Sequence, residues 1–63
     1  MEEETHTQIL SQFNTYVEEN EKFVEKGNKA AATRARKALL TIKKLAQSRR
    51  VEILEEKKSQ VTA

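Results

Sequence analysis

Residues 25–50, EKGNKAAATRARKALLTIKKLAQSRR, decide the fold because they hold the only glycine of the chain and its longest uninterrupted helical pattern. Gly27 suits the left-handed conformation that ends a helix, and Asn28 can cap the next helix or accommodate the turn. The chain contains no proline that would interrupt a helix elsewhere. We therefore predict two helices that meet at a turn over residues 27–28.

Positive charge gathers in the segment that follows this turn. Residues 29–50 contain eight basic residues and no acidic residue, which gives a local charge of +8 in a chain of net charge +2. At about 100° per residue, the cations form a stripe with a seven-residue repeat and a parallel row beside it: Lys29, Arg36, Lys43, Arg50 and Lys57, and Lys37, Lys44 and Lys58. From Lys29 to Arg50 the stripe is about 32 Å long, close to one turn of B-DNA at about 34 Å. Its charge and its length both suit a duplex backbone.

The same helix carries an apolar arc. Within about 60° either side of Ala35 lie Ala31, Ala32, Ala38, Leu39, Ile42, Ala46 and Ile53. Upstream of the turn, apolar residues recur at spacings typical of a helix: Ile9, Leu10, Phe13, Tyr16, Val17, Phe23 and Val24, with Asn20 continuing the same face. These patterns predict amphipathic helices over about residues 3–26 and 29–58, followed by a frayed tail over residues 59–63.

The two halves of the chain carry opposite charge. Residues 1–28 contain seven acidic residues and two lysines, so this half should attract the basic half and close an antiparallel hairpin. Pairing outward from the turn sets large side chains opposite smaller ones along much of the hairpin: Val24 with Ala31, Phe23 with Ala32, Val17 with Ala38, Tyr16 with Leu39, Phe13 with Ile42 and Leu10 with Leu45. Alternation of this kind allows two helices to approach and interdigitate.

A single hairpin leaves little core. A domain of 63 residues rarely gains more than about 3–5 kcal/mol from its core without disulfides, a metal or a partner. The chain has no cysteine and only one histidine, which excludes a disulfide and a structural zinc site. The predicted fold is therefore one all-α domain, a coiled-coil-like antiparallel two-helix hairpin that self-associates into a helical bundle.

The apolar residues near the end of the second helix predict where the subunits contact each other. Ile53, Leu54 and Val61 extend past the predicted start of the first helix and lack cover within one chain. We expect Leu54 and Val51 to lie in a subunit contact. Leu40, outside the main apolar arc, is either exposed or part of the same contact.

No constellation of side chains supports catalysis. His6 stands alone near a terminus, and the three serines lack a nucleophile elbow. A hairpin of this size also offers no concave pocket in which pKa values could be tuned. We predict that the protein is not an enzyme, that it has no cofactor, metal or small-molecule substrate, and that His6 lies on the surface.

Two polar residues fall on the apolar faces. Asn20 either fixes the register of the helices at some cost in stability or lies near the surface, where it is tolerated. Arg49 is expected to be a rim residue whose charged head reaches water, rather than a member of a buried ion pair with a glutamate of the first helix. The aromatic residues lie at helical spacing and are predicted to be core, which argues against stacking on single-stranded nucleic acid.

The sequence EKGNKAAATRAR over residues 25–36 resembles the chlamydial linker-histone-like proteins, a family of bacterial histone-like nucleoid proteins. The likeness continues more loosely over most of residues 10–58. It implies sequence-independent DNA binding in a bacterial nucleoid, with Lys26, Lys29, Arg34, Arg36 and Lys37 at positions that the family motif shares. The long members of the family add a tail rich in Lys, Ala and Pro, which the 63 residues do not include, so the resemblance is to a short form.

These observations predict a DNA-binding, histone-like protein that compacts or bridges duplexes without sequence preference. The residues predicted to contact phosphates are Lys29, Arg34, Arg36, Lys37, Lys43, Lys44 and Arg50. The alternative is a coiled-coil oligomerisation or scaffolding module whose basic face binds an acidic protein. A basic amphipathic membrane helix is a weaker interpretation, because the apolar arc is rich in alanine. The acidic N-terminus and the lack of a membrane-spanning apolar run predict a cytosolic location, and the resemblance implies the nucleoid of a bacterium.

Overall fold

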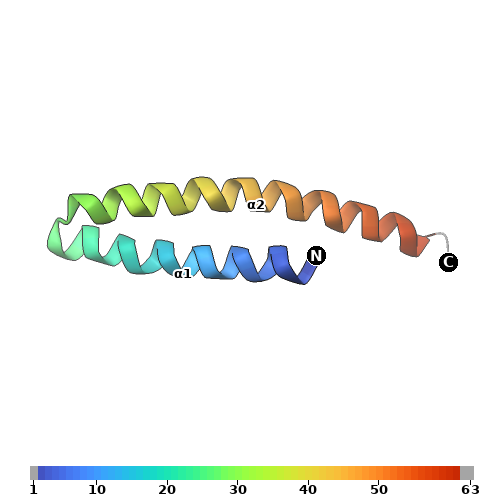
Figure 1. The fold of residues 1–63 in the computed structure, drawn as a ribbon, viewed down its shortest axis with the longest axis horizontal. Helices are drawn as coiled ribbons and strands as arrows, with labels where there is room; N and C mark the ends of the chain where they lie inside the picture. Colours follow the sequence, from blue (N-terminus) through green and yellow to red (C-terminus); the bar gives the residue numbers. More distant parts are fainter. Residues whose placement is uncertain (1, 62–63) are drawn as a thin grey trace.

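A computed structural model describes residues 2–61 of the chain, with side chains for residues 4–59. Helix α1 spans Glu2–Lys26 and helix α2 spans Lys29–Val61. The two helices lie side by side and run in opposite directions (Figure 1), in a molecule with extents of 54 × 15 × 14 Å. The described residues contain no strand. The predicted all-α helical hairpin is therefore confirmed.

Helix α2 is longer than the sequence pattern indicated. It continues to Val61, whereas the prediction ended it near residue 58 and expected fraying from residue 59. The side chain of Val61 and residues 62–63 lie outside the described part of the chain. Past the start of α1, α2 continues alone (Figure 1), and Ile53 and Leu54 are exposed as expected.

The turn is built from the two residues that the sequence singled out. Gly27 has a φ of +65°, and its N–H donates to the carbonyl of Phe23 at 2.9 Å, a hydrogen bond that closes the end of α1 in the left-handed cap. Asn28 caps α2, because its Oδ1 accepts a hydrogen bond at 3.1 Å from the N–H of Ala31. Both termini that meet at the turn thus have partners for backbone groups that a helix leaves unpaired.

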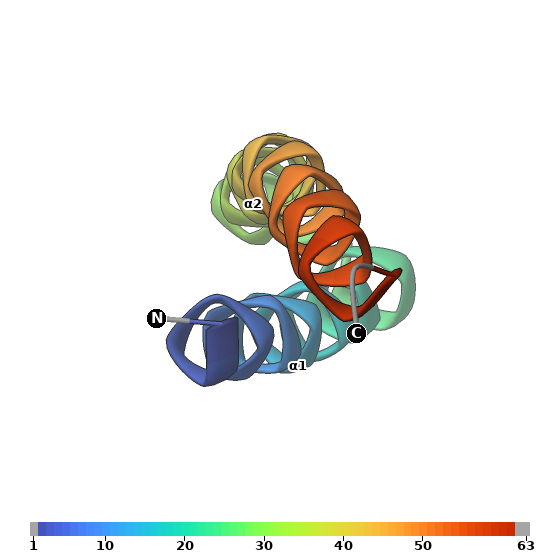
Figure 2. The ribbon, with the colours of Figure 1, turned by 90° about the vertical axis from the view of Figure 1, so that its right-hand side faces the viewer.

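The contact between the helices follows a heptad pattern. On α2 the buried and half-buried positions that define this contact alternate at spacings of four and three: Ala31, Ala35, Ala38, Ile42, Leu45, Arg49 and Glu52. On α1 the matching positions are Thr5, Ile9, Gln12, Tyr16 and Glu19. We call this contact the seam. Such spacing is the signature of coiled-coil packing, and the two helix axes are accordingly inclined to each other (Figure 2).

Most of the predicted core pairs are wrong on the α1 side. Five of the residues predicted to be core on α1, and Leu39 of α2, are exposed, with exposed fractions between 38% and 67%. They are Leu10, Phe13, Val17, Phe23, Val24 and Leu39. The buried hydrophobic residues within the described part of the chain are three alanines of α2, Ala31, Ala35 and Ala38. The register itself is close to the prediction, because Thr5 contacts Glu52 and Glu19 contacts Arg34 at nearly equal distances from the turn.

Most of the predicted core residues of α1 are exposed because α1 has two adjacent rows of residues that could face α2. A single partner helix covers only one of these rows. The row that faces α2 includes the polar residues Thr5, Gln12 and Glu19. The more apolar row, with Leu10 and Val17, lies beside the seam. A hairpin that leaves this row exposed has an unusually small apolar core.

Candidate nucleic-acid interface

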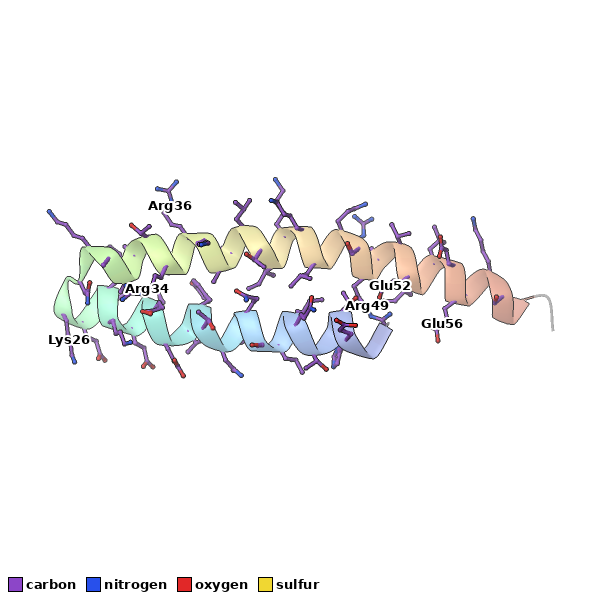
Figure 3. The ribbon with its side chains drawn as sticks, in the orientation of Figure 1. Lys26, Arg34, Arg36, Arg49, Glu52 and Glu56 are labelled. Carbon is purple, nitrogen blue, oxygen red and sulfur yellow. The ribbon has the colours of Figure 1, made fainter. Side chains whose placement is uncertain are left out.

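The face of α2 that points away from α1 is cationic. Six of the residues predicted to contact phosphates are exposed there, and we call them the cationic face: Lys29, Arg36, Lys37, Lys43, Lys44 and Arg50. Figure 3 shows Arg36 directed away from α1, on the opposite side of the hairpin from Lys26. The heptad repeat produces this arrangement, because residues seven positions apart return to nearly the same angle on a helix.

The charges of the cationic face are uncompensated within the described part of the chain. Ion pairs among the described residues involve the cations Lys22, Arg34 and Arg49, none of which belongs to this face. Arg50 donates a hydrogen bond at 3.4 Å to Gln47, a neutral side chain. No acidic residue occurs between Lys29 and Val51 in the sequence. An external anion therefore has six exposed cations available without displacing a carboxylate of the described chain.

Arg34 differs from the other predicted phosphate ligands. Its Nε donates a hydrogen bond at 2.7 Å to Oε1 of Glu19 on α1, and Figure 3 shows it directed toward α1. Lys22 lies 3.8 Å from the other carboxylate oxygen. The charge of Arg34 is thus compensated, and its place is in the contact between the helices.

The environment of this ion pair favours the charged form of both partners. The hydrogen bond from Arg34 lowers the pKa of Glu19, although partial burial opposes it, and the positive charges of Arg34 and Lys22 add to the lowering. The same hydrogen bond raises the pKa of Arg34. Sequence reasoning missed Glu19, yet the signal was present, because Glu19 and Arg34 lie at similar distances from the turn in an antiparallel pairing.

Arg49, expected to be a rim residue, is also paired. Its Nη1 lies 3.3 Å from Oε1 of Glu52 on the same helix, and Oε2 of Glu52 accepts a hydrogen bond at 2.8 Å from the hydroxyl of Thr5. Arg49 is therefore half-buried at the open end of the seam, in an ion pair within α2 rather than with a glutamate of α1. His6 is exposed as predicted, and Asn20 is half-buried at the edge of the seam.

Apolar side chains interrupt the cationic face at two points. Thr33, Arg36, Lys37 and Leu40 line one shallow hollow, and Gln47, Arg50, Val51, Ile53 and Leu54 line another. Both are open to solvent along the surface of a single helix. A surface of this shape can meet an extended charged partner, but it does not enclose a small molecule.

Other kinds of site find no support in the described residues. Among residues 4–59, whose side chains the structure describes, no three acidic or histidine side chains gather in a way suited to a metal ion. Neither helix, as far as it is described, combines the length and apolarity that crossing a membrane requires.

The chain matches one known protein family over nearly its whole length. Residues 3–59 match the family described as histone H1-like protein Hc1. No match was found among curated proteins or among solved structures. The matched range includes the turn, the cationic face and the segment over residues 25–36 that carries the resemblance noted from the sequence. The chain therefore belongs to the histone H1-like protein Hc1 family.

Proposed function

We propose that the chain binds duplex DNA without sequence preference, through contacts between phosphates and the cationic face of α2. The observation that carries this proposal is the cationic face itself, six exposed cations on one side of a helix with no carboxylate among them. Membership of a histone H1-like family supports the same function, because the name of that family refers to proteins of chromatin.

The distribution of charge gives the bound complex an orientation. Acidic residues dominate α1, whose sequence contains seven glutamates and two lysines, so DNA is repelled from that helix and attracted to the outer face of α2. Arg34 and Arg49 contribute little, because carboxylates of the chain already hold them. The proposed phosphate ligands are therefore the six residues of the cationic face.

Low specificity follows from the chemistry of these contacts. Phosphate contacts fix the position of a protein on DNA but carry no information about bases. Among residues 29–59, the only Asn or Gln side chain is Gln47, which accepts a hydrogen bond from Arg50 of the cationic face, so there is no row of Asn or Gln suited to adenine edges. A protein of this kind is suited to coat, compact or bridge duplexes in a bacterial nucleoid, acts without catalysis, and functions as a self-associated assembly.

A mobility-shift titration tests the function. Duplexes of equal length and unrelated sequence should bind within a few-fold of one another, and affinity should fall steeply as salt rises, by a slope of about −0.9 for each contacted phosphate. A strong preference for one sequence would require base readout and contradict the proposal.

The same titration separates the second candidate function, a scaffold for an acidic protein. The exposed hydrophobic residues beside the seam give that function its support, since they could serve assembly without DNA. A folded chain that fails to bind plain duplex even at low salt would favour the scaffold.

A further inference from the structure

The two sides of the hairpin that flank the seam differ in chemistry. One side, the polar side, carries the ion pair between Glu19 and Arg34. The other, the apolar side, carries exposed hydrophobic side chains from both helices: Leu10, Phe13, Val17 and Val24 of α1 and Leu39 and Ile53 of α2. The cationic face, on the outer side of α2, borders the apolar side at Lys43 and Arg50.

Both helices contribute to the apolar side because they run in opposite directions. Val17 on α1 and Leu39 on α2 each lie about 90–120° around the helix axis from the seam, measured in the direction in which successive residues turn. Because the two helices are antiparallel, residues rotated from the seam by similar angles in this direction lie on the same side of the hairpin. Glu19 and Arg34 precede the seam by about 40–50°, and their 2.7 Å contact demonstrates the same geometry for the opposite side.

We infer that a second copy of the chain covers the apolar side, with α1 of each copy packed against α2 of the other. A two-fold axis parallel to the helices produces this arrangement and keeps residues at the same level along the hairpin. Leu10 then meets Ala46 of the second copy, Val17 meets Leu39 and Val24 meets Ala32. In each of these pairs the two residues lie equally far from Asn28 in the sequence.

Size complementarity favours these pairs. Leu10 and Val24 are large and exposed, whereas Ala46 and Ala32 are small and only half-buried. The helices of the two copies can therefore approach closely, while the larger side chains fill the space between them. Among the described residues, a single copy buries only alanines of its hydrophobic side chains, so this second contact supplies the burial that a chain of 63 residues lacks.

Charge selects this arrangement over its alternative. Beyond the apolar row, α1 presents Glu21 and α2 presents Arg36, both exposed and seven and eight residues from Asn28 in the sequence. Packing α1 on α2 of the second copy therefore sets this carboxylate beside a cation. The alternative two-fold axis, across the helices, would pack α1 on α1 and α2 on α2, which sets like charges together and is disfavoured.

The arrangement also has a consequence for DNA, which rests on the proposed function. In cross-section, the resulting four-helix bundle has the two α2 helices at diagonally opposite corners. The two cationic faces therefore point in opposite directions. One assembly can then hold two duplexes, which is the geometry of a bridge. Compaction would arise from this pairing rather than from a bend imposed on one duplex.

Substitutions at Leu10 test the packing through charge. The neighbours of Leu10 on its own helix face, His6, Thr7, Phe13 and Asn14, include no Lys, Arg, Asp or Glu, so the charge across the interface decides the outcome. We compare Leu10→Glu with Leu10→Lys by sedimentation equilibrium over a range of concentrations. The inferred arrangement sets residue 10 beside Lys43 and Arg50 of the second copy, so Leu10→Lys should weaken association about tenfold more than Leu10→Glu does.

The opposite order, with Leu10→Lys the better associating variant, would overturn the arrangement, because it would mean that α1 packs on the acidic α1 of the second copy. A wild-type chain that sediments as a monomer would overturn the docking altogether. Circular dichroism at high concentration checks that both variants remain helical.

A cysteine experiment decides the matter even where the Leu10 variants fold poorly. The chain has no cysteine, so Val24→Cys and Ala32→Cys can be mixed as single-cysteine chains and oxidised. The mixed disulfide should exceed the statistical half of the products, whereas a predominance of either symmetric disulfide would contradict the inferred contact. DNA plays no part in either packing experiment.

Bridging is then measured by capture of a labelled duplex on a bead-bound duplex. The wild type should capture it, and Leu10→Lys should bind a single duplex in a mobility shift but capture about tenfold less of the second. Association without any DNA binding would leave the packing intact and reject the proposed function. DNA binding by a chain that remains monomeric would support the proposed function and reject the packing.

Discussion

The outer faces of α1 and α2 are similar in exposure and opposite in charge. Both helices pack through the same seam, and both present exposed charged residues to solvent on the side away from it. On α1 these residues are mainly glutamates, and on α2 they are the cationic face. The contrast indicates that the seam determines the fold, while the residues opposite the seam are free to carry function.

Only a small part of the charge connects the two helices. Among the described residues, Glu19 and Arg34 form the ion pair that crosses the seam, and Arg49 is paired within α2. The remaining cations of α2 up to Arg50 point away from the acidic helix, across a molecule about 15 Å thick. The chain therefore keeps opposite charges apart instead of neutralising them, which is the distribution an anion-binding protein needs.

The largest expected effect comes from the turn that sets the two faces on opposite sides. Gly27 has a φ of +65°, and a Cβ at this position would meet no atom within 4 Å, so a substitution there meets backbone strain rather than a clash. Gly27→Val should lower the free energy of unfolding by about 1–2 kcal/mol, measured by urea denaturation. Gly27→Asn should cost less, because asparagine tolerates the left-handed region. Equal stability of the Val variant and the wild type would contradict this role of the turn.

A second, smaller effect distinguishes two arginines of the same helix. Arg36 lies on the cationic face, whereas Arg34 is held by Glu19. Arg36→Gln should flatten the salt dependence of DNA binding by about 0.9 and leave the melting temperature unchanged. Arg34→Gln should lower the melting temperature and leave the salt dependence unchanged. Identical effects of the two substitutions on the salt dependence would remove the distinction between seam and face.

The smallest effect is a dependence on acid. The pKa of Glu19 is lowered in the folded chain, chiefly by the hydrogen bond from Arg34. Its contribution to stability is therefore complete above the pKa of the unfolded chain and is lost as the pH falls through the lower pKa of the folded state. Thermal melts at neutral and acid pH should show a smaller acid-induced loss for Glu19→Gln than for the wild type. An unchanged loss would mean that other carboxylates carry the acid dependence.

Much of the fold could be predicted from the sequence because its signals are local. Gly27 and Asn28 specify the turn through their own backbone and side-chain chemistry, and Ala31, Ala35 and Ala38 lie on the arc that the apolar pattern marked. The cations of the outer face could be predicted for the same reason, since a seven-residue repeat keeps them together.

Which residues form the contact between the helices could not be predicted by placing the sequence on a straight helix at about 100° per residue. A seam that repeats every seven residues drifts by about 20° per heptad on such a projection, so the seam passes to Leu45, Arg49 and Glu52 rather than to Ala46 and Ile53. On α1 the row that faces the partner is the more polar one. Two of its polar members have partners that lie far away in the sequence, Glu52 for Thr5 and Arg34 for Glu19, and periodicity contains no such information.

Two pairs of basic residues that differ in the face they occupy test whether the cationic face, rather than net charge, binds DNA. Arg36→Gln with Lys43→Gln removes two charges from the cationic face, and Lys22→Gln with Lys26→Gln removes two charges from α1. Glutamine retains a helix propensity close to that of lysine and arginine, so circular dichroism should show both variants helical. The slope of log affinity against log salt for duplex DNA should flatten by about 2 for each bound chain in the first variant and stay at the wild-type value in the second. Equal flattening in both would show that net charge alone governs binding, and no change in either would show that the cationic face does not contact DNA.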